Sequence, residues 1–363
     1  MNAIAAPTSL LCELTFRCNL QCPYCYNPLD LGVVRDELSL SSWTEVVRQA
    51  AALGVLQIGF SGGEPTLRAD DLVALVREAR AHDCYTNLIT QGTFLDETLL
   101  DALCANGLDH IQISLQALTP QLAAHIAGTD VLEDKLDAIR RVQSRPVALT
   151  LNYVLHRQNM QSIREVIAFA ERQHIRKLEL ANVQFYGWGL LNRGSLMPTM
   201  NQVEEASQIV GAESQRLRGK MEIAYVLADY FGSRPKACMN GWARAFMTVT
   251  PYGQSLPCPA ASAIQSLHFP TVGDSTLAQA WYESAAFAAY RGTAWMPEPC
   301  RSCERREIDW GGCRCQAFAL TGDAAVTDPA CELSDSHYLV EALRSETSND
   351  VFVPRRMHAG NRD

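Results

Sequence analysis

Residues 10–25 read LLCELTFRCNLQCPYC, a short apolar run followed by three closely spaced cysteines. The run from Leu10 to Thr15 is typical of a buried strand, so Cys18, Cys22 and Cys25 fall in the loop at its carboxyl end. Parallel α/β folds place their chemistry in loops of this kind. The stretch therefore predicts a parallel sheet with a functional site beside its first strand.

Downstream of this stretch, short apolar runs alternate with amphipathic segments as far as about residue 190. The candidate strands are Leu10–Thr15, Val55–Phe60, Tyr85–Thr90, His110–Leu115, Val147–Leu155 and Lys177–Val183. The candidate helices are Trp43–Leu53, Asp71–Ala81, Glu97–Ala105, Val131–Val142 and Gln161–Arg172. This alternation predicts a parallel α/β sheet, either doubly wound or an incomplete barrel, and the pattern alone does not choose between them.

The overall composition is that of a globular chain with about two domains. The chain has 363 residues, and 47% of them are hydrophobic, which is enough for a sizeable core. The net charge is -9 and basic runs are short, so we expect no nucleic-acid partner. We find neither a secretory signal pattern nor an apolar run long enough to cross a bilayer, so we expect a cytoplasmic protein with no membrane partner.

Cysteine is the outlier of the composition, with 13 residues. In a reducing compartment, clustered cysteines more often bind metal or react than form structural disulfides. Seven lie between Cys238 and Cys331, in a region rich in Gly, Pro and charge that would need metals or other staples to hold it. In contrast, Cys12 lies in a predicted strand, Cys84 at the start of another and Cys104 in a predicted helix, and we expect them to be packing residues.

The spacing of Cys18, Cys22 and Cys25 suits a four-iron cluster with three thiolate ligands, which leaves one iron open. From the residues alone, two alternatives stay open. One is a zinc site, and the other is a thioredoxin-like redox pair at Cys22 and Cys25, against which the third cysteine counts.

The C-x3-C-x2-C motif, with Tyr24 before its last cysteine, resembles that of the radical S-adenosylmethionine (SAM) enzymes. The resemblance implies that the three cysteines hold a 4Fe-4S cluster and that SAM chelates the open iron through its amino and carboxylate groups. It also implies that an electron cleaves SAM to methionine and a 5′-deoxyadenosyl radical. The implied fold is a partial six-stranded, TIM-like (β/α)6 barrel, which selects the barrel over the doubly wound sheet.

Two further features fit the same resemblance. The segment Ser61–Pro65, which contains Gly62, Gly63 and Glu64, follows the second predicted strand and is similar to the segment that binds the SAM amino group in that superfamily. Glycines let a backbone approach a ligand closely, and a carboxylate accepts hydrogen bonds from an ammonium. The remaining SAM contacts that the resemblance implies are Ser114, Gln116, Asn152 and Gln184, each of which could equally be an ordinary strand-end hydrogen bonder.

The second group of cysteines resembles the SPASM extension of radical SAM maturases, which binds two auxiliary iron-sulfur clusters. Asp309 stands where that pattern has a cysteine. The resemblance implies a distal 4Fe-4S cluster on Cys300, Cys303, Asp309 and Cys331. It implies a proximal cluster, 4Fe-4S or 2Fe-2S, on Cys238, Cys258, Cys313 and Cys315. From the residues alone, one or two zinc sites and an exposed turn carboxylate at Asp309 stay open.

Asp309, together with Cys313-Arg-Cys315, resembles the PqqE family, the peptide cyclases of pyrroloquinoline quinone (PQQ) biosynthesis, over residues 8 to 345. The resemblance divides the chain into a radical SAM core (8–225), a C-terminal SPASM domain (226–345) and a mobile tail (346–363). It implies a carbon-carbon cross-link between Glu and Tyr side chains of a PqqA-like precursor peptide. A PqqD-like chaperone would deliver the peptide, and a flavodoxin-like or other reductant would supply the electron.

Another SPASM maturase, of the mycofactocin or sulfatase type, is the alternative function. The reaction also needs a base to deprotonate the Tyr ring, and the sequence singles out no catalytic residue for this step. Tyr186, His156 and Glu179 are candidates because they would face the barrel opening.

Overall fold

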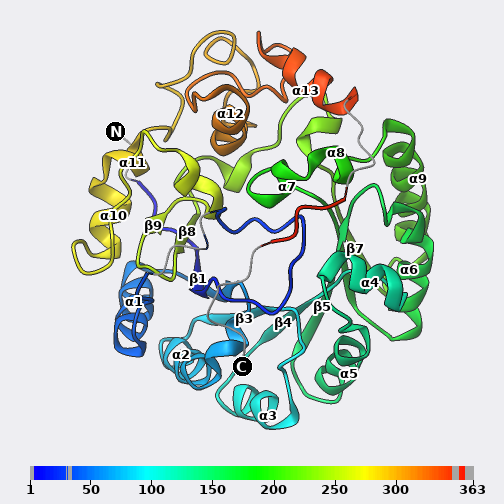
Figure 1. Ribbon diagram of the computed structural model, residues 1–363. Helices are drawn as coiled ribbons and strands as arrows, with labels where there is room; N and C mark the ends of the chain where they lie inside the picture. The colour runs from blue at the N-terminus through cyan, green and yellow to red at the C-terminus, as the bar shows by residue number, and fades with distance from the viewer. Residues whose placement is uncertain (1–3, 30, 32–34, 346–350, 356–363) are drawn as a thin grey trace.

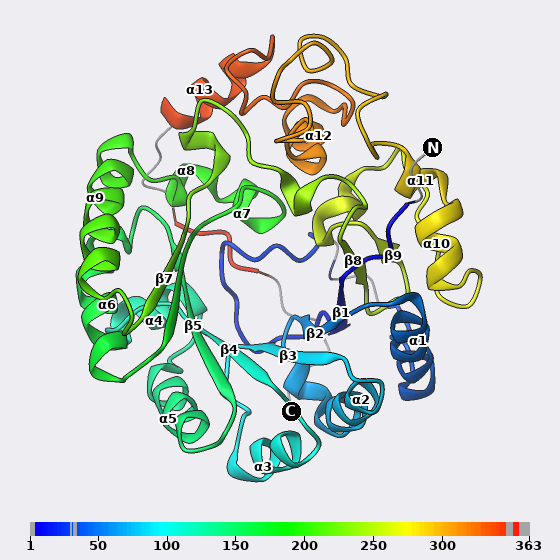
Figure 2. The same ribbon diagram turned by 180° about the vertical axis from the view of Figure 1, so that it is seen from behind.

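The computed structural model describes residues 4–29, 31, 35–345 and 351–355 (Figure 1). Its centre is a nine-stranded sheet with the order β7-β6-β5-β4-β3-β2-β1-β8-β9. The strands are β1 (Ser9–Thr15), β2 (Gln57–Gly62), β3 (Tyr85–Thr90), β4 (His110–Leu115), β5 (Ala148–Leu155), β6 (Lys177–Asn182), β7 (Glu222–Val226), β8 (Phe246–Val249) and β9 (Ser255–Leu256). All neighbouring strands are parallel except β8 and β9, and the sheet curves into an incomplete ring (Figures 1 and 2).

Helices lie on the outer side of this ring and across its open side, between the β7 and β9 ends of the sheet (Figure 1). They are α1 (Leu40–Leu53), α2 (Ala69–Ala81), α3 (Glu97–Ala105), α4 (Pro120–Ala127), α5 (Leu132–Gln143), α6 (Ile163–Arg172), α7 (Trp188–Leu191), α8 (Arg193–Leu196), α9 (Met200–Arg216), α10 (Leu277–Glu283), α11 (Ala285–Ala288), α12 (Arg314–Thr321) and α13 (His337–Ser345). Within the described ranges, none of the helices combines the length and the apolar character that a membrane crossing requires.

All six predicted strands are present, and β3 and β4 have the predicted bounds. The sheet nevertheless has three strands that the sequence pattern did not predict. β7 pairs with β6, β8 pairs with β1, and β9 pairs with β8. The six predicted strands of the barrel are therefore present, but the predicted sheet is too small. β7 (Glu222–Val226) extends it at the end of the predicted core, and β8 and β9 come from the region expected to form the SPASM domain. The boundary between residues 225 and 226 stays a prediction.

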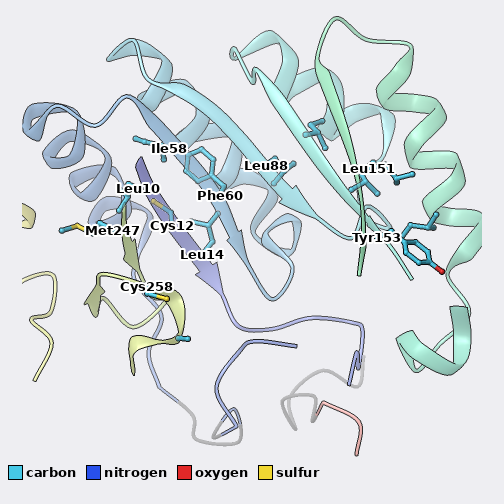
Figure 3. Packing of buried hydrophobic residues seen from close by; sticks show 14 of the residues in the cluster. Leu10, Cys12, Leu14, Ile58, Phe60, Leu88, Leu151, Tyr153, Met247 and Cys258 are labelled. Atoms are coloured by element: carbon cyan, nitrogen blue, oxygen red, sulfur yellow. The ribbon is translucent and has the colours of Figure 1, made fainter. Parts of the chain in front are cut away.

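The main core lies between the sheet and the helices. Alternate residues of β1 and β2 point into this layer and are almost completely buried, among them Leu10, Cys12, Ile58 and Phe60 (Figure 3). Cys12 and Cys84 have 0% and 1% of their surface exposed, and Cys104 is half-buried against the same cluster. The packing role predicted for these three cysteines is thus confirmed.

The residues that alternate with this core face the inside of the ring. Ser114 on β4, Asn152 on β5 and Glu179 on β6 are partners in the strand register and so form one polar row across the sheet. A polar row across the inner face of these strands leaves the interior suited to a ligand rather than to a packed apolar core.

The predicted mobile tail, residues 346–363, lies mostly outside the described residues. Residues 351–355 are described, and they enter the ring beside the loop that follows β1 (Figures 1 and 2). Phe352 and Arg355 are only 9% and 2% exposed. Two of these five residues are therefore packed in the interior, a position that the sequence did not indicate, while Val351, Val353 and Pro354 remain exposed.

Candidate active site

The loop after β1 carries the three predicted cluster ligands, Cys18, Cys22 and Cys25. Backbone hydrogen bonds fix this loop at both ends. Gln21 N donates to Ala127 O at 2.7 Å, and Trp188 N donates to Cys25 O at 3.2 Å. The loop is thus held between the end of α4 and the start of α7, inside the ring (Figure 1).

The three thiols keep some exposed surface, yet the protein surrounds them closely enough to disfavour the thiolate form. Burial raises the pKa of Cys18 to about 12 and that of Cys22 to about 11, and it raises the pKa of Cys25 as well. The charges of Lys135 and Arg355 oppose this effect at Cys22. Closely surrounded thiolates need a stronger cationic partner, which iron supplies, since a metal deprotonates the thiols that bind it. This soft donor set fits an iron-sulfur cluster.

Among the described residues, no three His, Cys, Asp or Glu side chains are placed to hold a single metal ion together. The ligands of a four-iron cluster each bind a different iron, so they need not converge on one point.

Gly62 and Gly63 end β2 directly beside the cysteine loop. A Cβ atom on Gly62 would lie 2.2 Å from Thr15 O, and one on Gly63 would lie 2.3 Å from Arg17 O. Gly62 also has a φ of +130°, which side chains disfavour. Both glycines are therefore required by the close approach of two backbone segments, whereas the sequence suggested the approach of a ligand.

Glu64 is completely buried and receives four hydrogen bonds. Thr66 donates its backbone N at 3.0 Å and its Oγ1 at 2.5 Å, Thr90 Oγ1 donates at 2.7 Å, and Gln91 N donates at 2.9 Å. These donors hold the carboxylate in one position beside the cysteine loop. The sequence predicted Glu64 but not Thr66, Thr90 and Gln91, which fix it.

Lys135 is a buried cation that the sequence reasoning missed. It is 1% exposed, and its Nζ donates to Ser114 O at 2.8 Å. Burial lowers its pKa to about 8, while the charges of Cys22, Glu64 and Cys18 act in the opposite direction. A signal was available, because Lys135 stands with Leu132, Ala138, Ile139 and Val142 on the buried face of α5, where the helical period calls for an apolar residue.

The other predicted SAM contacts lie on the same rim. Gln116 and Asn152 are 3% and 8% exposed, and Gln116 Nε2 donates to Ser114 Oγ at 3.5 Å. Gln184 follows β6 and donates through Nε2 to Asn182 O at 3.2 Å. Ser114, Gln116 and Gln184 therefore lie at the carboxyl ends of β4 and β6, and Asn152 lies within β5, in register with Ser114.

A second site is a small cavity lined by the four predicted distal ligands, Cys300, Cys303, Asp309 and Cys331. Asp309 is 8% exposed. Its Oδ1 accepts from Gly311 N at 3.1 Å, and its Oδ2 lies 3.4 Å from Arg305 Nε. Asp309 is thus a buried carboxylate grouped with three thiols, and not an exposed turn residue.

The four predicted proximal ligands, Cys238, Cys258, Cys313 and Cys315, form a third site. Hydrogen bonding between their thiols lowers the pKa of Cys258 and raises the pKa of Cys238 and Cys315. Three of them line one cavity together with Trp310 and Arg314. The structure therefore sorts the seven late cysteines and Asp309 into the same two groups that the sequence predicted.

Comparison with known proteins agrees with this arrangement. A family model described as the Radical SAM superfamily matches residues 12–170. A PqqA peptide cyclase of Granulibacter bethesdensis is 49% identical over 361 residues, covering 98% of this chain and 96% of that protein. A PqqA peptide cyclase of Gluconobacter oxydans is 51% identical over 342 residues, covering 94% and 95%. The chain belongs to the PqqA peptide cyclase family. It is therefore a radical SAM enzyme.

Solved structures show the same fold in more distant proteins. A crystal structure of SuiB from Streptococcus suis bound to S-adenosylmethionine has a TM-score of 0.75 with 19% identity, covering 91% of this chain and 78% of that one. A structure of anSMEcpe with bound AdoMet has a TM-score of 0.65 with 18% identity, covering 93% and 96%. The curved parallel sheet of this PqqA peptide cyclase family member is thus the radical SAM α/β fold.

Of the three predicted bases of this family member, His156 is buried and Tyr186 is half-buried. Burial, followed by the charges of Cys313 and Cys258, raises the pKa of Tyr186 well above its usual value. His156 is fully buried, which lowers its pKa to about 3, and its Nε2 has no hydrogen-bond partner within the described ranges. Both side chains are therefore neutral at physiological pH. The third, Glu179, lies in the polar row inside the ring.

Glu13 is a further acidic group that the sequence reasoning did not identify. It lies on β1, is 1% exposed, and accepts a hydrogen bond from Tyr26 Oη at 2.8 Å. Burial raises its pKa to about 8, which the hydrogen bond from Tyr26 partly offsets. The only sequence signal was a Glu inside an otherwise apolar strand.

Proposed function

We propose that this chain forms a carbon-carbon cross-link between a Glu and a Tyr side chain of a PqqA-like precursor peptide in PQQ biosynthesis. The observation that carries the proposal is the 49% identity, over 98% of the chain, to a PqqA peptide cyclase. The placement of three thiols, the buried Glu64 and the buried Lys135 around one interior space supports it.

In this proposal, Cys18, Cys22 and Cys25 hold a 4Fe-4S cluster beside a SAM site that Gly62, Gly63, Glu64, Ser114, Gln116, Asn152 and Gln184 line. Cluster and SAM together supply a 5′-deoxyadenosyl radical, the hard part of the chemistry. Glu64 would accept from the SAM amino group. Lys135 would donate to the SAM carboxylate, because an ammonium has three donors and the bond to Ser114 O uses one of them.

The overall reaction joins the γ-carbon of Glu to a ring carbon of Tyr and removes two hydrogens. One would leave the γ-carbon as a hydrogen atom, for which the bound SAM and cluster would supply the acceptor. The other leaves the ring as a proton, together with one electron, when aromaticity returns. The protein holds the two side chains in reach of each other and keeps water away from the carbon radical.

The electron needs an acceptor near the interior space, and the two late cysteine sites would provide it. The distal site would hold a 4Fe-4S cluster with Asp309 as one ligand, and the proximal site a 4Fe-4S or 2Fe-2S cluster. Tyr186 supports this route, because it follows β6 at the barrel mouth and lies within reach of the charges of Cys238, Cys258, Cys313 and Cys315.

The same proposal includes a PqqD-like chaperone for the peptide and a flavodoxin-like or other reductant. It places the reaction in the cytoplasm, because thiolate clusters persist in a reducing compartment.

Mass spectrometry of the peptide tests the proposal. The reconstituted full chain is incubated without oxygen with SAM, reductant, a PqqA-like peptide and the chaperone. We expect a product lighter by two hydrogens, with fragment ions that locate the link between Glu and Tyr. Cys22→Ala is the matched control and should give no product. An unmodified peptide, from protein that carries its iron and cleaves SAM, would refute the proposed function.

A further inference from the structure

Residues 351–355, here called the C-terminal strap, lie inside the ring against the cysteine loop (Figures 1 and 2). Asn192 clamps the strap by accepting from Val353 N at 2.7 Å and donating to Val353 O at 2.9 Å. The same amide nitrogen donates to Pro23 O at 2.9 Å, and Arg355 N donates to Gln21 O at 3.2 Å. The strap is therefore tied to the residues on either side of Cys22.

Phe352 anchors the other end of the strap. Its ring lies 4.9 Å from the ring of His125 and 6.3 Å from that of His156, measured between centroids. With 9% of its surface exposed, Phe352 fills the rim near β5 with apolar surface. Such a contact excludes water from that side of the cysteine loop.

Arg355 is the charged residue of the strap. Its guanidinium donates to Phe16 O, while its Nε has no hydrogen-bond partner in the described part of the chain. The same side chain lies close enough to Cys18, Cys22 and Cys25 for its charge to lower the pKa of each thiol, and it also acts as a donor to Cys25. A guanidinium that is 2% exposed needs an anionic partner to offset the loss of its water shell.

We propose that Arg355 is a positioning residue for the iron-sulfur cluster on Cys18, Cys22 and Cys25, and that the C-terminal strap holds the loop that carries this cluster. The inference rests on the proposed function, which places the cluster there. Positive charge and N–H donors next to cluster sulfurs stabilise the reduced, more negative state and so raise the reduction potential. The strap would thus make the cluster easier to reduce, besides holding its ligands.

Two truncated chains test the role of the strap. A chain ending at residue 355 keeps the strap, and a chain ending at residue 350 removes it. We expect the longer chain to match the full chain in iron content and SAM affinity. We expect the shorter chain to bind SAM about tenfold more weakly and to lose iron from this cluster alone. It loses the direct hydrogen bond from Arg355 N to Gln21 O and the two bonds that hold Asn192, the residue that donates to Pro23 O. The auxiliary clusters serve as an internal reference, because their ligands do not contact the strap through any hydrogen bond described above.

Arg355→Gln separates the charge from the rest of the strap. We expect a more negative midpoint potential for the SAM-binding cluster, measured by a redox titration followed by electron paramagnetic resonance, with Arg355→Lys lying between the two. Arg140→Gln, on the exposed side of α5, is the matched control and should leave the potential unchanged. Thermal unfolding of each variant shows whether it is folded.

An unchanged potential in Arg355→Gln would overturn the role of Arg355, whatever the truncated chains show. Equal iron content and SAM affinity in the chains ending at 350 and 355 would overturn the role of the strap. Both results differ from a failure of the proposed function, in which the full chain itself would lack the cluster or leave the peptide unmodified.

Discussion

Replacing Lys135 with Met should make the metal-free protein more stable while weakening SAM binding. Met has a similar length and no charge, so Lys135→Met removes the buried ammonium and keeps most of the packing. Burial lowers the pKa of Lys135 from 10.5 to about 8. At about 1.4 kcal/mol per pKa unit, this shift corresponds to roughly 3 kcal/mol of lost stability at pH 7. Since the bond to Ser114 O is lost as well, we expect a net gain of about 1–2 kcal/mol.

The pH dependence of this gain has a definite sign. The pKa of Lys135 is lower in the folded than in the unfolded protein, so between about pH 8 and 10.5 the unfolded chain binds more protons. The stability of the unchanged protein therefore rises with pH in this window. The advantage of Lys135→Met should be full below about pH 8, should disappear at about pH 9 and should become a net loss towards pH 10.5, where only the missing bond to Ser114 O remains.

The effect on SAM should be opposite, because Lys135→Met removes the proposed donor to the SAM carboxylate. A charge-assisted hydrogen bond of about 1.5–3 kcal/mol corresponds to roughly 10- to 100-fold weaker binding.

Urea unfolding of the metal-free protein at pH 7 and pH 10, under reducing conditions, measures the first effect, and an anaerobic SAM titration of the reconstituted protein measures the second. Lys220→Met, at an exposed position, is the control and should change neither quantity. A loss of stability at pH 7 in Lys135→Met would refute the burial argument. Unchanged SAM affinity would refute the assignment of Lys135 to the carboxylate.

Three further predictions concern the cysteines and Asp309. Cys22→Ala should abolish SAM cleavage but keep the iron of both auxiliary sites, as measured by iron analysis and detection of 5′-deoxyadenosine. Asp309→Ala should remove iron from the distal site and stop cross-linking while some uncoupled SAM cleavage continues, whereas Asp309→Cys should retain the iron. Cys12→Ala, Cys84→Ala and Cys104→Ala should leave the iron content unchanged, with a stability cost of about 1 kcal/mol for the buried Cys12 in urea unfolding.

Each of these three predictions has a result that contradicts it. Residual SAM cleavage in Cys22→Ala would exclude Cys22 as an essential ligand. Full iron content and cross-linking in Asp309→Ala would show that Asp309 is not a ligand of the distal cluster. Loss of a cluster in any of the three core variants would show that a ligand had been mistaken for a packing residue.

The strands and helices that the sequence predicted share one property, which is a clear local periodicity of hydrophobic residues. β3 and β4 have the predicted bounds because each is a short run bounded by turn residues and followed by an amphipathic helix. β7 has no fully buried residue, and β9 is only two residues long, so neither carries a hydrophobic period that a sequence can show. These two strands join the sheet because β6 and β8 each offer an unpaired edge to them.

The residues of the candidate site likewise fall into those that the sequence reveals and those that it does not. Closely spaced cysteines and the Gly-Gly-Glu segment stand out in the sequence, because their chemistry requires particular residue types at short separations. Arg355 could not be found in this way, since its hydrogen-bond partner Phe16 lies 339 positions away along the chain. Lys135 can be recognised in the sequence as a charged residue on an otherwise apolar helical face. The sequence does not tell whether such a lysine extends to the solvent or is buried.

Lys135 and Arg355 together connect stability to the proposed function. Each is a cation with 2% or less of its surface exposed, and each lies next to the cysteine loop. In the metal-free chain neither forms an ion pair with a carboxylate of the described residues, so their burial lowers the free energy of unfolding. A thiolate cluster and the SAM carboxylate would supply that negative charge. Because a ligand that binds only the folded state stabilises it, loading the site should raise the unfolding temperature more in the unchanged chain than in Lys135→Met or Arg355→Gln.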